Sequence, residues 1–441
     1  MNLNLKCIAM RIARPAQAIA ILLLLASGCT VAFAANSCVN PGGKSGCWPT
    51  ISGAVAAASA GDVITVWAGA YPEQVNITKS ISLVAAAGAR PVINANGKFR
   101  GIFINGMATA PIAGVWNVVV SGFEVHNASY EGILVANGSN ITLLNNYVHD
   151  NNKALQPFAV PAACPGIDAF ETSEAMDCGE GIHLMAADHS SVIDNLVADN
   201  SGGILISDET GPVSSNLIRG NTVTGNAWAC GITMASHPNA LGGLPFGISH
   251  NVISQNESHH NGLGIPGAGA GVGIFAPFPG TSNTANVITG NELYGNGLPG
   301  VTMHNHAYSP FAPPVSLNDN VILGNHIHGN AADLGDAATG GTTGINIFSL
   351  APVSGLVISN NQFGVEAINI AFNVPSGSRS VHFNNFNAPG TGIDNKGTGL
   401  IDATENWWNC SNGPSASCSS TVGSGITSTP FLTTPFAFSV N

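Results

Sequence analysis

One six-residue pattern, Asn-x-apolar-x-x-Asn, recurs along the chain and constrains its fold more than any other feature. Six copies keep both asparagines and the apolar residue, namely N-Y-V-H-D-N (146–151), N-L-V-A-D-N (195–200), N-T-V-T-G-N (221–226), N-V-I-S-Q-N (251–256), N-E-L-Y-G-N (291–296) and N-H-I-H-G-N (325–330). A degenerate copy begins at Asn361. Repeats spaced a few tens of residues apart are typical of a solenoid, in which each repeat contacts only its neighbours.

Two further short apolar segments accompany these copies. A glycine followed by an apolar-x-apolar strand occurs at G-I-L-V (132–135), G-I-H-L (181–184), G-I-L-I (203–206), G-I-T-M (231–234), G-I-F-A (273–276), G-V-T-M (300–303) and G-I-N-I (344–347). A third strand lies between the two, as in I-T-L-L (141–144). Three strands per repeat predict a coil with three corners per rung, whose rungs stack about 4.8 Å apart and bury a continuous apolar column.

The recurring asparagines have a structural interpretation. Asparagine tolerates the left-handed backbone conformation needed at a corner, and stacked amides can form a hydrogen-bonded ladder between rungs. We therefore expect the Asn, Gly and Ile residues of these patterns to build the rungs, and we look for function elsewhere.

Composition supports a folded solenoid and excludes some partners. Hydrophobic residues make up 45% of the chain and charged residues only 8%, the opposite of the balance in disordered chains. The formal charge of -12 argues against nucleic acid, whose binding needs clustered Lys and Arg. It also disfavours polyanionic sugars unless a cation bridges them.

Residues 1–34 have the features of a secretory signal. Three basic residues precede the apolar run 16–25, and Ala32-Phe33-Ala34 supplies a small-x-small cleavage site, predicted after Ala34. The apolar run is too short for a good membrane span. We therefore expect a secreted or periplasmic, monomeric mature chain without a transmembrane anchor. Its formal charge is -15, because the signal removes three positive charges and no negative ones.

Cysteine spacing agrees with export. Seven of the nine cysteines follow the predicted signal. In an exported protein three close pairs predict short-range disulfides and leave Cys230 as a buried thiol. The pairs are Cys38 with Cys47, Cys164 with Cys178, and Cys410 with Cys418.

The repeat and both ends resemble the right-handed parallel β-helix repeat family, the pectate-lyase-like superfamily. The stretch 50–75, which ends in Gly69-x-Tyr71-x-Glu73, is similar to the family's capping helix and first strand, and N-W-W-N-C-S-N-G-P (406–414) is similar to its closing module. The resemblance implies an all-β, single-stranded right-handed parallel β-helix of roughly ten rungs over 35–441. Its N-terminal cap and first rungs would occupy 50–100, and its C-terminal cap 402–441.

In enzymes of this superfamily the substrate lies along the outer face of one sheet. The glycine-led strands fit that sheet, because the largest insertion, 152–180, immediately precedes one of them, and long loops in compact folds are usually functional. Register gathers Glu180, His183 and Asp208 into a candidate catalytic cluster. Two carboxyl groups can act as general acid and base on a sugar, with the histidine relaying protons.

Candidate binding residues surround this cluster. Those for substrate are Lys153, Glu209, His237, Phe275 and His304, with Phe275 stacked beside Thr233. Asp168 and Asp177 in the insertion are candidate Ca²⁺ ligands, and Lys153 is a candidate base for a lyase that acts on a Ca²⁺-neutralised uronate. The competing interpretation is that these residues are ordinary polar groups on an exposed face.

Three functions stay open. The first is a carbohydrate-active enzyme that acts on an extracellular polysaccharide by lyase or glycoside hydrolase chemistry. The motifs of known activities, such as D-F-I-F-G, N-T-D and D-P-H-D, are missing, so a non-catalytic carbohydrate-binding solenoid is the alternative. The second alternative is a periplasmic copper-binding accessory protein, suggested by 13 histidines with Met185, Met234 and Met303, although Met234 and Met303 fall at inward positions.

Two smaller features complete the picture. In N-H-I-H-G-N, His326 and His328 occupy outward slots beside Glu292 and Tyr294 of the previous rung, so a metal site competes with a plain solvent face. The glycine-rich stretch 259–273 lacks the Lys-Ser/Thr ending of a phosphate-binding loop, and we interpret it as a flexible loop.

Overall fold

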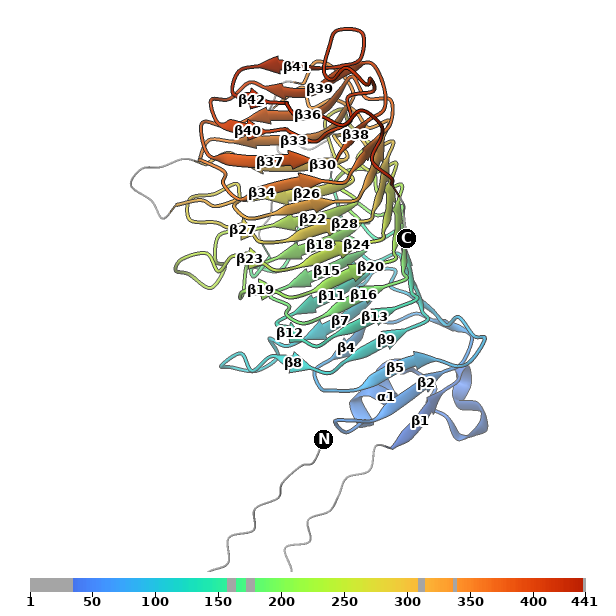
Figure 1. Ribbon diagram of the computed structural model, residues 1–441. Coiled ribbons are helices and arrows are strands. Elements are labelled where there is room, and N and C mark those ends of the chain that lie inside the picture. The colour runs from blue at the N-terminus through green and yellow to red at the C-terminus, as the bar shows by residue number, and fades with distance from the viewer. Residues whose placement is uncertain (1–34, 157–163, 172–178, 308–313, 336–338, 439–441) are drawn as a thin grey trace, which may run out of the picture. The chain divides into compact units, whose positions relative to one another are not determined.

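The computed structural model describes residues 35–156, 164–171, 179–307, 314–335 and 339–438, which form a parallel β-helix with three long sheets (Figure 1). Sheet A contains β1 (Asn36–Val39), β2 (Val63–Val66), β5 (Ser82–Ala85), β9 (Val119–Ser121), β13 (Thr142–Leu144), β16 (Ser191–Ile193), β20 (Leu217–Arg219), β24 (Val252–Ser254), β28 (Val287–Thr289), β31 (Val321–Leu323), β34 (Leu356–Ser359), β37 (Ser378–His382), β40 (Leu400–Asp402) and β42 (Ile426–Thr427).

Sheets B and C complete each rung. Sheet B contains β3 (Ala70–Tyr71), β6 (Val92–Asn94), β10 (Glu124–His126), β14 (Tyr147–His149), β17 (Leu196–Ala198), β21 (Thr222–Thr224), β25 (Glu257–His259), β29 (Glu292–Tyr294), β32 (His326–His328), β35 (Gln362–Phe363) and β38 (Asn385–Phe386). Sheet C contains β4 (Val75–Ile77), β7 (Ile102–Asn105), β11 (Ile133–Ala136), β15 (Ile182–Met185), β18 (Ile204–Ser207), β22 (Ile232–Ala235), β26 (Val272–Phe275), β30 (Val301–Asn305), β33 (Thr343–Ser349), β36 (Ile368–Asn373), β39 (Gly390–Asn395) and β41 (Ser419–Gly423).

Smaller elements lie at the corners and at one end. Two short parallel sheets follow sheet C: β8 (Val115–Trp116) with β12 (Gly138–Ser139), and β19 (Val213–Ser214) with β23 (Ile248–Ser249) and β27 (Asn283–Thr284). A 3₁₀ segment, Pro41–Gly46, and the helix α1 (Ile51–Ala57) precede β2. The predicted three-strand rung is thus confirmed.

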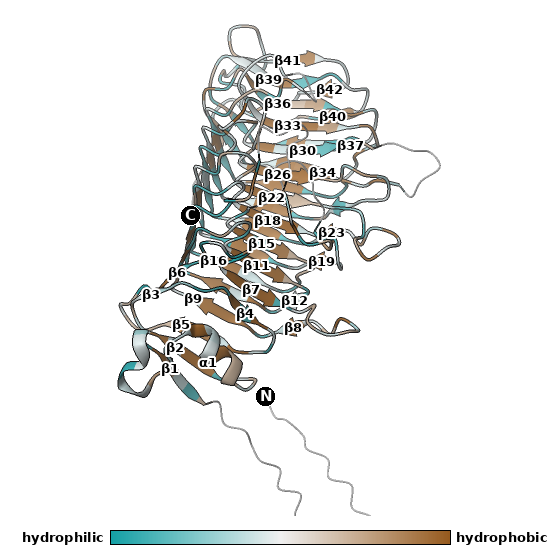
Figure 2. Ribbon diagram, turned by 180° about the vertical axis from the view of Figure 1, so that it is seen from behind, coloured by the Kyte–Doolittle hydropathy of each residue, from teal (hydrophilic) through white to brown (hydrophobic). Residues whose placement is uncertain are grey.

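Inward residues of all three sheets form one continuous apolar core. On sheet B the central residue of most strands points inward, as Val148, Val197 and Ile327 do, all fully buried. The strands of sheet C are predominantly hydrophobic along the stack (Figure 2). Met234 and Met303 are core residues, as their inward positions predicted.

Asparagine ladders bind the rungs together. They occur at more corners than expected, and the reason that asparagine recurs there differs from the predicted one. Both ends of the sheet B strands carry a ladder, in which one asparagine's side-chain oxygen accepts bonds from the backbone and side-chain amides of the previous one. The left-handed conformation predicted for these asparagines belongs instead to the residue before each, such as Gly220 (φ +68) before Asn221. That residue makes the turn, which leaves the asparagine's amide pointing inward.

Both predicted end modules close the core. Helix α1 packs Ile51, Ala54 and Val55 onto it, and the Glu73 carboxylate accepts hydrogen bonds of 2.8 Å from the Ile51 and Ser52 backbone amides. Glu73 of the Gly-x-Tyr-x-Glu motif therefore caps the helix. At the other end Trp408 is fully buried against Phe386, with ring centroids 4.8 Å apart.

Disulfides match the predicted pairing where the structure describes it. Cys38 bonds Cys47 and Cys410 bonds Cys418. Cys164 is also disulfide-bonded, but Cys178 lies outside the described residues, as does the predicted signal 1–34. The buried Cys230 keeps its thiol. Disulfides persist in oxidising compartments, which indicates an extracellular or periplasmic location. The helices within the described ranges are too short or too polar to cross a bilayer.

Candidate functional site

Described residues of the insertion, within 164–171, pack on the outer face of sheet C. Phe170 packs against an apolar cluster of outward residues that includes Phe103, Leu134 and Met185. Outward residues of β11 and β15 are consequently buried, Leu134 completely and His183 to 97%. The interpretation of this face as exposed is therefore wrong at these rungs, because the insertion and its neighbours cover it.

Arg100 lies at the centre of the covered region. Its Nε donates to Glu131 Oε2 and its Nη1 to Asp168 Oδ2, both at 2.8 Å, and its Nη2 donates to Glu171 Oε1. The guanidinium also stacks over the ring of Phe103 at 5.0 Å. One buried arginine thus joins a rung residue to two residues of the insertion.

Acidic groups outnumber basic groups around Arg100. Burial would lower the Arg100 pKa, but Glu131, Glu171 and Asp168 outweigh burial and raise it. Burial raises the Glu171 pKa well above its ordinary value, and Glu131 and Glu180 add to the effect while Arg100 opposes it. The Glu171 carboxyl group is therefore easier to protonate than an ordinary glutamate.

A second set of polar contacts begins at His183. Its Nε2 lies 2.7 Å from Ser207 Oγ, and that hydroxyl donates to Glu209 Oε2. Glu209 Oε1 in turn lies 3.1 Å from Nδ1 of His237. Although burial opposes ionisation, His237 and His183 lower the Glu209 pKa to about 2. Glu209 is an anion held between two imidazoles.

Asp208 anchors a loop. Its carboxylate accepts from the His237 backbone amide at 2.6 Å, the Ser236 hydroxyl at 2.9 Å and the Gly247 backbone amide at 2.5 Å. Burial nevertheless raises its pKa to about 6. These bonds give Asp208 a structural task beside its predicted catalytic one, which stays a prediction. We call Glu131, Glu171, Glu180, His183, Ser207, Asp208, Glu209 and His237 the buried cluster.

We expect the wild-type protein to lose stability relative to Asp208→Asn as the pH rises from about 4 to about 7. Between the ordinary aspartate pKa and about 6, folded Asp208 keeps a proton that the unfolded chain has released. That contribution is present at low pH and lost as the pH passes about 6. The difference in free energy of unfolding should change by at most about 3 kcal/mol. Urea unfolding across this pH range measures it, and a difference independent of pH would contradict it.

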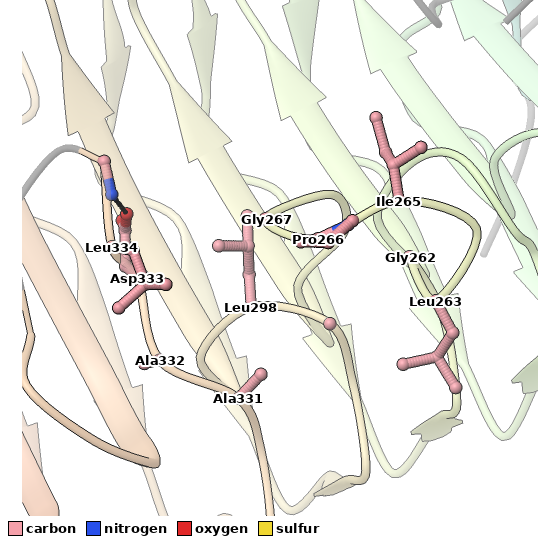
Figure 3. A pocket seen from close by; sticks show the side chains of 12 residues that line it. Gly262, Leu263, Ile265, Pro266, Gly267, Leu298, Ala331, Ala332, Asp333 and Leu334 are labelled. Atoms are coloured by element: carbon pink, nitrogen blue, oxygen red, sulfur yellow. Dashed lines mark hydrogen bonds between the residues drawn. The ribbon is translucent and has the colours of Figure 1, made fainter. Parts of the chain in front are cut away.

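An open groove lies beside the buried cluster. One cavity of about 360 Å³ is lined by Trp228, Thr233, Ala235, Phe275 and His306, among others. A second, of about 590 Å³, shares Ile265, Gly267 and Leu298 with the first. Figure 3 shows the lining of the second cavity, contributed by successive loops, with Asp333 at one end. We call the two together the sheet C groove.

The groove floor continues the cluster in register. Thr233 pairs with Leu205, which pairs with His183, and Ala235 pairs with Ser207. Phe275 pairs with Ala235 and not with Thr233, which corrects the predicted register by two residues. The strand is led by Gly271, because a Cβ there would contact the carbonyl of the next leading glycine, Gly300, at 2.7 Å.

His304 lies next to Asp333, which lines the second cavity. Its Nε2 is 3.2 Å from Asp333 Oδ2, and Asn346 Nδ2 donates to the same oxygen at 2.8 Å. The His304 ring packs edge-on against Phe275, with centroids 5.9 Å apart. Two predicted substrate-binding residues, Phe275 and His304, are thus neighbours, and Asp333 contacts His304.

The remaining predicted residues lie elsewhere or are occupied. Lys153 is half-exposed and pairs with Asp150 at 3.7 Å. Asp168 is engaged by Arg100, and Asp177, its predicted partner for Ca²⁺, lies outside the described residues. Met185, one of the three methionines behind the copper hypothesis, packs in the apolar cluster. The Ca²⁺ site and the lysine base therefore stay predictions.

Three parts of the site were missed in the sequence. Arg100 and Glu131 were not singled out, although each directly precedes a strand-leading glycine, Gly101 and Gly132, so register places them on adjacent rungs. Ser207 is an outward residue of a glycine-led strand, and its residue type alone does not indicate that it connects His183 with Glu209. The glycine-rich stretch 259–273, interpreted as a flexible loop, lines both cavities of the groove. This stretch contains more glycine than the neighbouring turns, and that difference was the sequence signal that could have indicated its role in the groove.

Comparison with known proteins agrees with this architecture. A family model described as a right handed beta helix region matches residues 94–274. The fold is a right-handed parallel β-helix. No curated protein sequence matches the chain.

Several solved structures are similar at low identity. The Dettilon tailspike protein is 13% identical with a TM-score of 0.47, and the match covers 83% of this chain and 60% of the tailspike. Alginate lyase from Paenibacillus sp. is 10% identical, with a TM-score of 0.43 and coverage of 73% and 94%. The mannuronan C-5 epimerase A-module of Azotobacter vinelandii is 13% identical, with a TM-score of 0.43 and coverage of 86% and 93%.

Proposed function

We propose that the protein binds an extracellular polysaccharide of low charge in the sheet C groove and hydrolyses it at the buried cluster. The observation that carries the proposal is the register that makes Ser207 and Ala235 neighbours on one outer face. A polymer lying along sheet C would pass from Phe275 over Ala235 to the histidine and carboxyl groups one rung further. Buried ionisable groups are costly in a solenoid, so their concentration beside a groove supports a functional role.

Charge favours a neutral polymer over a uronate. The single arginine of the site, Arg100, is already shared by three carboxylates. Asp208 and Glu209 add further negative charge, so an anionic sugar would be repelled unless a cation accompanied it. Acid and base catalysis by carboxyl groups on a neutral glycosidic bond does not require such a cation.

Two groups are suited to opposite proton-transfer roles. Glu171, with its raised pKa, would donate a proton to the leaving oxygen. Glu209, with its lowered pKa, would stay ionised. Through the Ser207 hydroxyl it would orient His183, and His183 would be the proton acceptor. Of the two carboxyl groups predicted to be catalytic, Glu180 would be the second carboxyl group beside Glu171, and Asp208 would anchor the loop.

The second candidate function is binding without cleavage. It is favoured by the burial of the cluster, in which Glu171, the most accessible carboxyl group, is only 6% exposed. In that case the groove aromatics alone would contact the glycan, and the buried charges would hold the insertion in place.

Screening the mature chain against a panel of neutral and acidic polysaccharides, with and without Ca²⁺, tests both functions. We expect release of reducing ends from a neutral polymer. Glu171→Gln should lower kcat by about 10²-fold or more. Trp228→Ala should weaken binding with kcat retained, because Trp228 lies in the groove. The exposed Glu405→Gln serves as control.

Outcomes separate the candidates clearly. Cleavage that ignores Glu171→Gln, Glu180→Gln and Asp208→Asn would overturn the assignment of the cluster. Binding that depends on Trp228 without any cleavage would establish the second function. Cleavage of uronates only with Ca²⁺, and with formation of an unsaturated product, would favour the lyase alternative.

A further inference from the structure

Two histidines and one glutamate converge on the outer face of sheet B. Strand β32 pairs with β29 so that His326 lies opposite Glu292 and His328 opposite Tyr294. Glu292 Oε1 is 2.8 Å from His326 Nδ1 and 2.8 Å from His328 Nε2. The sequence placed these residues side by side, and the structure brings one atom of each to a common point.

The spacing of these three atoms suits one metal ion. Ligand atoms 2.0–2.2 Å from an ion, at angles of 90–110°, are about 2.8–3.6 Å apart. Both glutamate–histidine distances fall at the short end of that range, and all three ligand atoms lie within 4.8 Å of one another. Small side-chain rotations about χ2 would open the two rings around an ion without moving the rungs.

The chemistry of the donors selects the kind of ion. Two imidazoles and one carboxylate suit Zn²⁺, Ni²⁺, Cu²⁺ or Co²⁺, whereas Ca²⁺ and Mg²⁺ prefer oxygen ligands only. The three side chains are between 27% and 35% exposed, so an ion can enter and complete its coordination with water.

Surrounding residues hold the ligands in place. The Tyr294 ring stacks on His328 with centroids 5.0 Å apart and donates its hydroxyl to Glu257 Oε1 at 2.7 Å. On the other side Gly364 leaves room for His328, because a Cβ there would approach His328 Cβ to 2.6 Å. An arrangement fixed by a rigid sheet loses little conformational freedom when it binds an ion.

We propose that Glu292, His326 and His328 form a binding site for a divalent first-row transition metal ion. The site lies on a different sheet from the groove and does not depend on the proposed polysaccharide activity. When an ion is bound, each neutral ring would present its lone pair to the metal and carry its proton on the other nitrogen.

Titration of the untagged mature protein with Zn²⁺ tests this proposal. We expect one site of roughly micromolar affinity and a rise in Tm on adding Zn²⁺. His326→Ala and His328→Ala should each weaken Zn²⁺ binding at least about 10-fold and abolish the Tm rise. Glu292→Gln, which preserves size, should weaken it also. His189→Ala is the matched control, because His189 pairs with one carboxylate, Asp188, at 2.7 Å and belongs to neither group of three clustered metal-ligating side chains among the described residues.

Circular dichroism of each variant without metal verifies its fold, and anomalous scattering from Zn²⁺-soaked crystals locates the ion. Density at the three ligand atoms would support the proposal. Wild-type protein that binds no Zn²⁺, or variants of all three residues that bind it as tightly as the wild type, would overturn it. Binding lost equally in His189→Ala would also overturn it.

Discussion

Replacing Arg100 by Met is expected to lower the free energy of unfolding at pH 7 by about 3–5 kcal/mol, the usual cost of removing one partner from a buried ion pair. Methionine keeps an apolar side chain but removes the guanidinium that lies over Phe103, and it leaves Glu131 and Glu171 buried without their cation. Chemical denaturation of wild type and variant measures the loss. The loss should shrink as the pH falls, because the remaining carboxyl groups then take up protons and become neutral.

Arg219→Met provides the control, since Arg219 is an exposed residue of sheet A. Its effect should stay within about 0.5 kcal/mol. Hydrogen exchange adds a local measurement. If Arg100 fastens the insertion, Arg100→Met should speed exchange at Ile167 and Glu171, whose backbone amides bond to Cys164 and Asp168. A loss of stability no greater than that of Arg219→Met would contradict the assigned role of Arg100.

Replacing Asn256 by Ala is expected to cost about 2–4 kcal/mol, because it orphans several buried polar groups at once. Asn256 Oδ1 accepts from the backbone and side-chain amides of Asn221, and its Nδ2 donates to Ile218 O and Asn291 Oδ1. Water cannot replace these bonds, since Asn256 is 99% buried. Denaturation measures the cost, and hydrogen exchange should rise most in the rungs that adjoin β25.

Asn96→Ala is the matched control, because Asn96 lies exposed in a turn, outside the ladders. Its effect should be within about 0.5 kcal/mol. An equal effect of the two substitutions would show that the ladder adds no measurable stability. The ladder then would not be what holds the rungs in register.

The covered face of sheet C links stability to function. Arg100 fixes the insertion over the same rungs that carry Glu180 and His183, so loosening it should change access to the buried cluster as well as stability. If the cluster is catalytic, Arg100→Met should alter the pH profile of turnover. If the protein only binds glycan in the groove, binding should be unaffected.

Local patterns in the sequence were enough to determine the coil. Each strand is short, repeats with its neighbours and alternates inward with outward residues, so the core and the ladders follow from period and residue type. The closing modules were implied by the family resemblance of 50–75 and 406–414. The disulfides of the two ends followed from spacing. The pairing of Glu292 with His326 was also readable, because adjacent rungs of a regular sheet have a fixed register.

Only the tertiary structure decided which outward residues are buried and which of them meet. Arg100 and Glu131 lie in register on adjacent rungs, but the contact of Arg100 with Glu171 depends on how an insertion without a repeat pattern folds back. The offset of Phe275 depended on which glycine leads its strand, a choice made by backbone packing against Gly300. The rungs could be predicted because their strands repeat in the sequence. The contacts of the insertion with sheet C could not be predicted, because long-range contacts of loops leave no repeating pattern.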